Sequence, residues 1–371
     1  MNDAPSTQGS SPPAAGTWLP RERSHLVNAV LVSSLVLMAV FALVRGSVIF
    51  IPLAVAFLFW FFINALAGFY QRLWSRWFGW GRMASLPLAF LTFLTISLMV
   101  VQLVVVNVSE IGARANEFER SLDVLISKVA EVTGVSNDEV INTIVNNLSI
   151  EQLVTAILLT MTGIASQFGI VFLYVIFLLV EQQFFDLKLR AVVVDEGRRQ
   201  QIRSMIQRIG HDIQSYLWTM TVASVLTAVL SYFVMAVVGL DSAAFWAFLI
   251  FTLNFIPTVG SVLSTAIPAL YALLQFGDLG PFLTLLIAIG AIQFVIGNIV
   301  QPRLAAKSLN LSQFVVILAL FVWGAIWGIV GMFLAVPLTA IVMLVCSNFE
   351  GTRPLAMILS ESGALKGEPE R

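Results

Sequence analysis

The chain has 371 residues, of which 58% are hydrophobic and only 11% charged, and its formal net charge is -1. Soluble domains carry about 25% charged residues, so this composition excludes most soluble folds. The near-neutral charge leaves no basic surface for nucleic acid, and a single cysteine, Cys346, excludes a disulfide framework within one chain. The hydrophobic residues form long blocks without period-2 alternation, which predicts an all-α, polytopic membrane helix bundle.

The first third of the chain predicts a tail followed by three membrane helices. Residues 1–26 are rich in Ser, Pro, Ala and Gly, so we expect a disordered cytoplasmic tail. We do not expect a signal peptide, because the first apolar stretch comes late and is too long. Residues 27–106 predict membrane helices 1–3, and the basic, Trp-containing segment 71–82 is typical of an interfacial belt on the cytoplasmic side.

Two polar segments flank the fourth predicted membrane helix, 153–182. Residues 107–152 contain eight acidic and three basic residues with apolar residues at helical spacing, which predicts an extracytoplasmic helical insertion. Residues 183–213 contain six basic residues and an apolar stripe. This pattern predicts a cytoplasmic amphipathic helix at the membrane surface.

Residues 214–347 form a predicted transport core that begins with membrane helix 5. Two apolar blocks follow, 243–275 and 313–347, separated by the ordinary span 281–299. A continuous helix of the longer block would be about 52 Å long, against a hydrocarbon core of about 30 Å. Each block therefore either tilts and protrudes or folds into a hairpin.

The placement of basic residues favours hairpins over tilted helices. Short loops rich in Lys and Arg stay on the cytoplasmic side. If 243–275 is a hairpin, Arg303 and Lys307 lie on the same side as the other basic segments. We therefore expect about eight membrane segments, with two broken-helix hairpins in opposite orientations forming an inverted repeat, as in many transporters. Both termini, including the tail 348–371, are then cytoplasmic.

The broken helices supply the candidate site. Unwound backbone survives at membrane depth only inside protein or around a wet cavity, and Pro257 removes a backbone donor there. The alternatives are a purely structural turn and amides that only join helices. The predicted substrate-binding residues are Asn254, Pro257, Thr258, Gly260, Ser261, Gln293, Asn298 and Gln301. For packing or for a gating hinge in the second hairpin, the candidates are Gly324, Gly328, Gly331 and Pro337.

Catalytic motifs are absent from the sequence. The two histidines, His25 and His211, lie far apart, and there is no His-Glu-x-x-His, Gly-x-Ser-x-Gly or Walker sequence. We therefore expect no enzyme activity, no metal site and no cofactor. The hairpins and the span 281–299 also contain no Asp or Glu, the groups that proton- or sodium-coupled carriers commonly use.

Three motifs in the last third carry a family resemblance. They are Asn254-Phe-Ile-Pro-Thr-Val-Gly260; then Gly297-Asn-Ile-Val-Gln-Pro-Arg303 with Lys307-Ser-Leu-Asn-Leu311; and finally Trp323-Gly324 and Trp327-Gly328 before Gly331-Met-Phe-Leu-Ala-Val-Pro-Leu338. In this order they resemble the autoinducer-2 exporter family of transporters. The resemblance implies a bacterial inner-membrane permease, embedded in the lipid bilayer as a homo-oligomer, that exports a small polar solute such as an autoinducer-2-like quorum-sensing signal.

Alternative functions remain open at this stage beside a carrier working by alternating access. Some members of that family are similar to sodium/proton antiporters, and many relatives carry an acid beside the Asn of the second motif. This chain has Ile296 and Gly297 there, which disfavours a cation/proton antiporter. A non-transporting membrane scaffold would use 107–152 and 183–213 as docking surfaces, and a passive channel would conduct without saturation.

Overall fold

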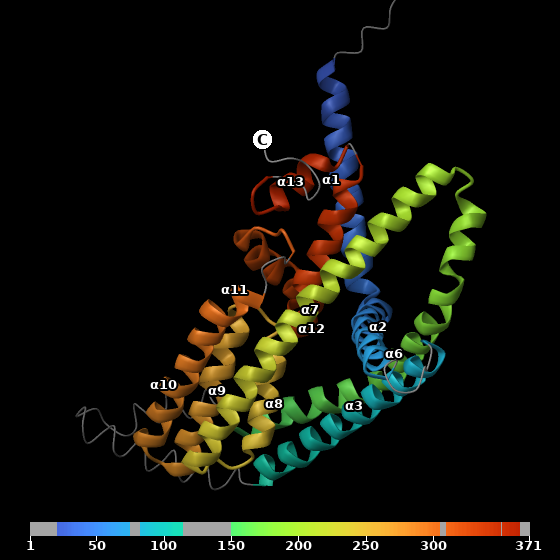
Figure 1. Ribbon diagram of the computed structural model, residues 1–371. Coiled ribbons are helices and arrows are strands. Elements are labelled where there is room, and N and C mark those ends of the chain that lie inside the picture. Colours follow the sequence, from blue (N-terminus) through green and yellow to red (C-terminus); the bar gives the residue numbers. More distant parts are fainter. Residues whose placement is uncertain (1–20, 75–81, 114–149, 305–308, 350, 364–371) are drawn as a thin grey trace, which may run out of the picture. The chain divides into compact units, whose positions relative to one another are not determined.

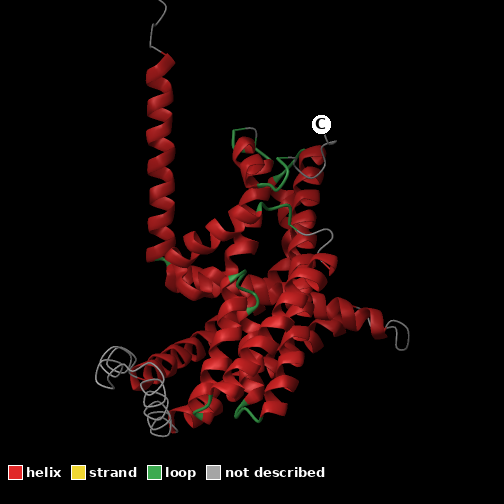
Figure 2. Ribbon diagram, turned by 90° about the vertical axis from the view of Figure 1, so that its left-hand side faces the viewer, coloured by secondary structure: helices red, strands yellow, loops and turns green. Residues whose placement is uncertain are grey.

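The computed structural model describes residues 21–74, 82–113, 150–304, 309–349 and 351–363. In these ranges the chain is helical almost throughout, as Figure 2 shows, and the only extended pairing is an isolated bridge between Leu311 and Ser360. Most of the tail 1–26 and of the insertion 107–152 lies outside the described residues. The helices of the described part are α1 (Arg21–Arg45), α2 (Ser47–Trp74), α3 (Arg82–Ala113), α6 (Ile150–Val192), α7 (Glu196–Val238), α8 (Ala243–Leu253), α9 (Val259–Phe276), α10 (Leu279–Val295), the π-helix η1 (Ile296–Val300), α11 (Gln301–Leu304), α12 (Gln313–Ser347) and α13 (Arg353–Leu359).

Many of the described helices are long and apolar enough to cross a bilayer. Seven segments meet that condition, and Val30–Arg45 and Ala243–Leu253 are shorter apolar helices. The prediction of an all-α, polytopic membrane protein is therefore confirmed. The seven segments are Ser47–Leu73, Ala84–Ala113, Gln167–Val192, Glu196–Val238, Val259–Phe276, Leu279–Leu304 and Gln313–Ser347.

Residues 1–47 and 48–371 form two separate units. In the first unit, α1 exposes nearly all of its described apolar side chains, including Leu35 and Met38. The Arg45 guanidinium lies 5.6 Å from the centroid of the Phe41 ring, a cation–π contact that shields part of the charge at the end of the helix.

Helices α6 and α7 run far beyond a bilayer thickness. Each has 43 residues, about 64 Å at 1.5 Å per residue. Residues 183–213 are therefore not a separate amphipathic helix, as the sequence had suggested. They are the end of α6 and the start of α7, divided where Asp195 caps α7 by accepting the Arg198 N–H at 2.6 Å.

The second unit contains two apolar clusters. One is formed by α7, α8, α9 and α10, which lie side by side in Figure 1, together with Val104 and Val108 of α3, and its fully buried side chains include Met235, Ile250 and Leu285. In the other, α2, α3 and α6 bury Ile63 and Val175. Rings of Phe59, Phe93 and Phe172 extend this second cluster, with centroids 4.8–6.4 Å apart. Because α7 ends at Gly239 in the left-handed conformation, the chain returns directly into α8.

Candidate functional site

The first hairpin consists of α8, the turn 254–258 and α9. The Ile256 N–H donates to the Leu253 carbonyl at 2.8 Å, and Thr258 takes a positive φ of 62° before α9 begins. The turn is so tight that a Cβ atom on Gly260 would lie 1.8 Å from the Leu253 oxygen. Glycine is therefore required at position 260 for the chain to return this closely.

The second hairpin lies within α12. Gly328 has φ 64° and ψ -142°, which breaks the helix, and a Cβ atom on Gly331 would lie 1.9 Å from the Trp323 oxygen. Trp323 Nε1 donates to Thr339 Oγ1 at 3.1 Å. In a continuous helix these two residues would be about 24 Å apart. The block therefore folds back on itself, which confirms the hairpin interpretation over a long tilted helix.

A hydrogen-bonded cluster lies beside the turn of the first hairpin. Gln293 Nε2, on α10, donates to Asn254 Oδ1 at 2.8 Å and to Ser264 Oγ at 2.6 Å. Ser264 is fully buried on α9, and its hydroxyl donates to the Ser261 carbonyl at 3.1 Å. The cluster therefore joins three separate chain segments through uncharged polar groups.

The cluster keeps unused hydrogen-bonding capacity. The Gln293 Oε1 acceptor and the Asn254 Nδ2 donor have no protein partner among the described residues, and both side chains are only half-buried. An acceptor and a donor on two amides that bond each other complement a hydroxyl group, which both donates and accepts. The cluster itself contains no titratable side chain, so it can bind a neutral polar molecule without a charge partner.

Of the other predicted site residues on the first hairpin, only Ser261 bonds the cluster, through its carbonyl. Pro257 is half-buried, Gly260 is buried and Thr258 is exposed. The Thr258 carbonyl accepts the Ser261 hydroxyl at 2.8 Å, which fastens the turn to the first residues of α9. These groups shape the turn that presents Asn254.

Asn298 and Gln301 lie away from the cluster. Asn298 is exposed and its Nδ2 donates to the Phe294 carbonyl at 2.9 Å, while Gln301 Nε2 lies 3.4 Å from the Met220 sulfur. The sequence had placed both on one face of a regular helix. The π-helix Ile296–Val300, just before Pro302 with its missing N–H, widens the turn and separates them.

The two hairpins meet through aromatic rings that the sequence did not single out. Phe255 follows Asn254, Phe333 follows Gly331 by two positions, and their rings stack with centroids 5.0 Å apart. Phe62 of α2 packs edge-on against Phe255 at 6.5 Å. No local signal identifies such a pair, because 78 residues separate its members along the chain.

The glycine candidates of the second hairpin have distinct positions. Gly328 is exposed at the break, Gly331 is buried against Trp323, and a Cβ atom on Gly324 would lie 3.0 Å from Met332. Pro337 is buried in the returning arm. The hairpin interior is apolar apart from the Trp323–Thr339 hydrogen bond, so it offers a solute little to bind.

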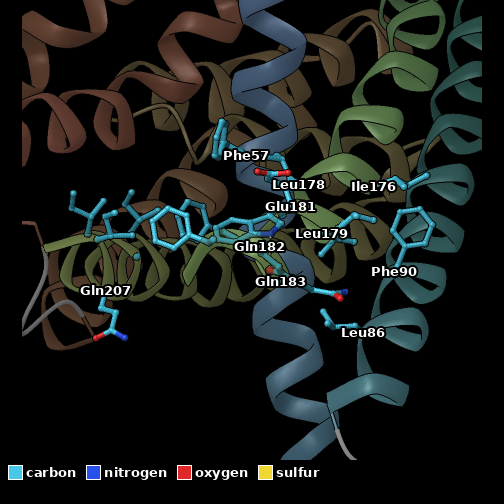
Figure 3. Close-up of a pocket in the computed structure, with 18 of the residues that line it drawn as sticks. Phe57, Leu86, Phe90, Ile176, Leu178, Leu179, Glu181, Gln182, Gln183 and Gln207 are labelled. Atoms are coloured by element: carbon cyan, nitrogen blue, oxygen red, sulfur yellow. Dashed lines mark hydrogen bonds between the residues drawn. The ribbon is translucent and has the colours of Figure 1, made fainter. Parts of the chain in front are cut away.

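A separate cavity of about 1350 Å³ lies between α2, α3, α6 and α7. Figure 3 shows Leu86 and Phe90 on one side of it and Gln207 on the other, with Glu181 and Gln182 between them. Its lining is mostly carbon, and the Trp60 Nε1–H donates to Gln182 Oε1 at 2.9 Å. The cavity is therefore chemically unlike the polar cluster of the first hairpin.

Comparison with known proteins decides the family. The family model described as "AI-2E family transporter" matches residues 31–350. This chain belongs to the AI-2E transporter family. It is therefore a multi-pass membrane protein of a transporter family, as the three sequence motifs predicted.

Individual relatives of this AI-2E family chain agree. The "AI-2 transport protein TqsA" of Escherichia coli is 34% identical over 209 residues, which cover 56% of this chain and 60% of the relative. Two relatives carry the name "Putative transport protein". The Borreliella burgdorferi protein is 33% identical, over 55% of this chain and 56% of the relative, and the Haemophilus influenzae protein is 30% identical, over 68% and 76%. The chain thus spans less than two thirds of the length of the first two of these three relatives.

Proposed function

We propose that this protein is an inner-membrane permease that moves a small, neutral polar solute by alternating access, with an autoinducer-2-like signal as substrate and export as direction. The observation that carries the proposal is the uncharged cluster of Asn254, Gln293 and Ser264 at the broken turn of the first hairpin. The name of the E. coli relative TqsA supports the choice of signal. Cytoplasmic termini and a homo-oligomeric assembly belong to the same proposal.

The cluster provides a binding step. A solute hydroxyl donates to Gln293 Oε1 and accepts from Asn254 Nδ2, while the Gln293–Ser264 hydrogen bond fixes the orientation of the amide. The carbonyls of Ile256, Pro257 and Thr258 already accept backbone N–H groups at the turn, so the two side-chain amides provide the binding groups. Binding then depends on a few directional hydrogen bonds and not on charge.

The hairpins provide the moving part. The stacked rings of Phe255 and Phe333 hold the two hairpins together, and the breaks at Thr258 and Gly328 are the positions where each hairpin bends. Separation of the rings opens the cluster to one side of the membrane, and their return closes it. In many transporters built from broken-helix repeats, alternating access is a movement of one repeat against the other.

Ion coupling finds little support in the described core. Glu181 is exposed and pairs with Lys188, and Asp241 lies in the loop between α7 and α8, where its own N–H bonds Gln275. Neither carboxylate belongs to the cluster. A neutral solute moving down its own gradient therefore needs no titratable group here.

A transport assay in proteoliposomes tests the proposal. Gln293→Leu removes both cluster hydrogen bonds with little change in volume, so we expect at least a tenfold loss of solute transport at unchanged protein yield. Gln275→Leu is the matched control, because Gln275 also makes two hydrogen bonds, to the Asp241 N–H and the Gly239 carbonyl, outside the cluster. Equal transport by both variants, or transport that survives Asn254→Ala combined with Pro257→Ala, would show that the solute binds elsewhere.

A further inference from the structure

The cavity between α2, α3, α6 and α7 needs an occupant. Its volume, about 1350 Å³, exceeds that of most pockets for drug-sized ligands. Water is a poor filler, because phenyl and aliphatic walls give it too few hydrogen-bond partners.

The walls identify where the occupant comes from. Phe57 of α2 and Ile176 of α6 line the cavity and are themselves exposed, with 45% and 43% of their surface accessible. The cavity is therefore open along membrane-spanning helices, where the surrounding medium is lipid. Acyl chains are the apolar molecules present there at the highest concentration.

Polar groups gather in one part of the lining. Glu181, Gln182 and Gln183 follow one another on α6, and Gln207 joins them from α7. Everything else that lines the cavity is apolar apart from the indole N–H of Trp60, which already bonds Gln182. An occupant that matches this lining has long apolar chains and one polar end.

Two basic side chains lie beside this polar part: Lys188 pairs with Glu181 of the lining, and Arg203 pairs with Asp186. Arg203 lies three and four residues before Ile206 and Gln207 of the lining and so shares their face of α7. Its guanidinium is half-exposed and bonds Asp186 of α6 at 3.1 Å, the residue that follows Phe185 of the lining in the chain. A guanidinium held in this way and still open to solvent is suited to a phosphodiester.

We propose that this cavity is a phospholipid site, with acyl chains against Phe57, Phe90 and Ile213 and the phosphate near Arg203 and the glutamine amides. The site is independent of the polar solute cluster. It ties α2 and α3 to the extended ends of α6 and α7 through a lipid drawn from the leaflet on the side of the basic 183–213 segment.

A larger side chain at position 210 would occupy part of the cavity. Gly210 lines it, and a Cβ atom there would lie 3.8 Å from Phe61 Cε1, an ordinary contact. Gly210→Trp places an indole in the cavity, and Gly210→Ala is the matched control that adds one methyl group. Arg203→Gln removes the phosphate partner at an exposed position, so it leaves folding intact even if the Trp variant does not fold.

The measurement is phospholipid retained per chain after purification of the full chain in detergent, read by mass spectrometry of the extracted lipid. We expect several-fold less retained phospholipid for Gly210→Trp and for Arg203→Gln, and wild-type retention for Gly210→Ala. Equal retention by all four proteins overturns the proposal. So does a Gly210→Trp variant that loses its oligomeric state but keeps its lipid, because a second copy of the chain then covers the cavity.

A thermal unfolding series separates the headgroup from the chains. Phosphatidylethanolamine and phosphatidylglycerol should each raise the unfolding temperature of the wild type and of Gly210→Ala, but not of Gly210→Trp. Inorganic phosphate alone, or a long-chain alcohol without phosphate, should have a clearly smaller effect. An equal shift with the alcohol means that the site binds any apolar molecule and that Arg203 has no role. Neither measurement involves solute transport, so failure of the permease proposal leaves this result unaffected.

Discussion

The first and second hairpins turn in a similar way, but the side chains at the turn are polar in the first and mostly apolar in the second. Each contains a glycine at which a Cβ atom would collide with a carbonyl oxygen seven or eight residues earlier, Gly260 with that of Leu253 and Gly331 with that of Trp323. Each also has a positive-φ residue shortly before that glycine. Yet the first hairpin carries the amide–hydroxyl cluster, whereas the second packs Trp323, Trp327 and Met332. Backbone geometry thus sets the shape of both hairpins, and only the side chains make one of them a candidate binding element.

The largest expected effect is common to both hairpins. Gly260→Ala and Gly331→Ala each force a Cβ atom within 2 Å of a carbonyl oxygen, so the returning helix of the hairpin must move. We expect a loss of about 3 kcal/mol or more in stability for each, beyond the usual range for overpacking. Gly68→Ala in α2, where a Cβ atom meets nothing within 4 Å, should be neutral or slightly stabilising. Chemical denaturation in detergent measures all three, and a strong difference between the two hairpins would contradict their equivalence.

The next effect separates the hairpins by function. Gln293→Leu should abolish most transport through the first hairpin, as described above. Trp323→Phe removes the hydrogen bond to Thr339 in the second hairpin but keeps an aromatic ring, so it should cost about 1 kcal/mol of stability and leave transport nearly unchanged. Transport that falls equally in both variants would mean that the second hairpin also contacts the solute.

A smaller effect concerns the contact between the hairpins. Phe255→Ala and Phe333→Ala should each destabilise the protein, and the double variant should cost less than their sum because the rings stack on each other. The expected coupling energy is about 0.5–1.5 kcal/mol. A double-mutant cycle measured by thermal or denaturant unfolding gives this value, and zero coupling would remove the hairpin–hairpin contact from the proposed movement.

The smallest expected effect concerns the buried hydroxyl groups of α7, which lie outside the first hairpin. Ser224 and Ser231 are buried there without a hydrogen-bond partner in the described part of the chain, whereas the Thr227 hydroxyl bonds the Ala223 carbonyl at 2.9 Å. Replacing an unpaired hydroxyl by Ala removes a desolvation penalty, so both Ser→Ala variants should gain up to about 1 kcal/mol in stability at unchanged transport. Thr227→Val should gain nothing. A transport defect in Ser224→Ala would instead place α7 in the solute path.

Much of the fold was predictable because its signals are local. Composition and block length predicted membrane helices, and Pro257 with Gly260 marked the first break in the chain. The division between α6 and α7 was missed, although Asp195 before Glu196 is a recognisable helix start. The basic residues and the apolar stripe of 183–213 favoured a single helix, and so the cap at Asp195 was not recognised.

The site was only partly predictable because its contacts are long-range. Asn254 and Gln293 were chosen as polar residues in apolar surroundings, but nothing in the sequence indicates that they bond each other across 39 positions. Asn298 was grouped with Gln301 because helical periodicity was assumed to be regular. The π-helix Ile296–Val300 breaks that assumption, and no residue pattern before it marks where the extra residue enters.

This π-helix holds one more residue than an α-helical turn would at the same place. If the extra residue moves along the helix from Ile296–Val300 toward α10, each position that it passes rotates by about 100°, since an α-helix turns once in 3.6 residues. Both ends of the helix stay where they are during such a shift. Gln293 is only three residues from Ile296, so one turn of migration is enough to point its amide away from Asn254 and Ser264. Irregular backbone in η1 therefore offers a way to break the cluster by shifting a short segment by one residue position, about 1.5 Å along the axis, while the rest of α10 stays in place.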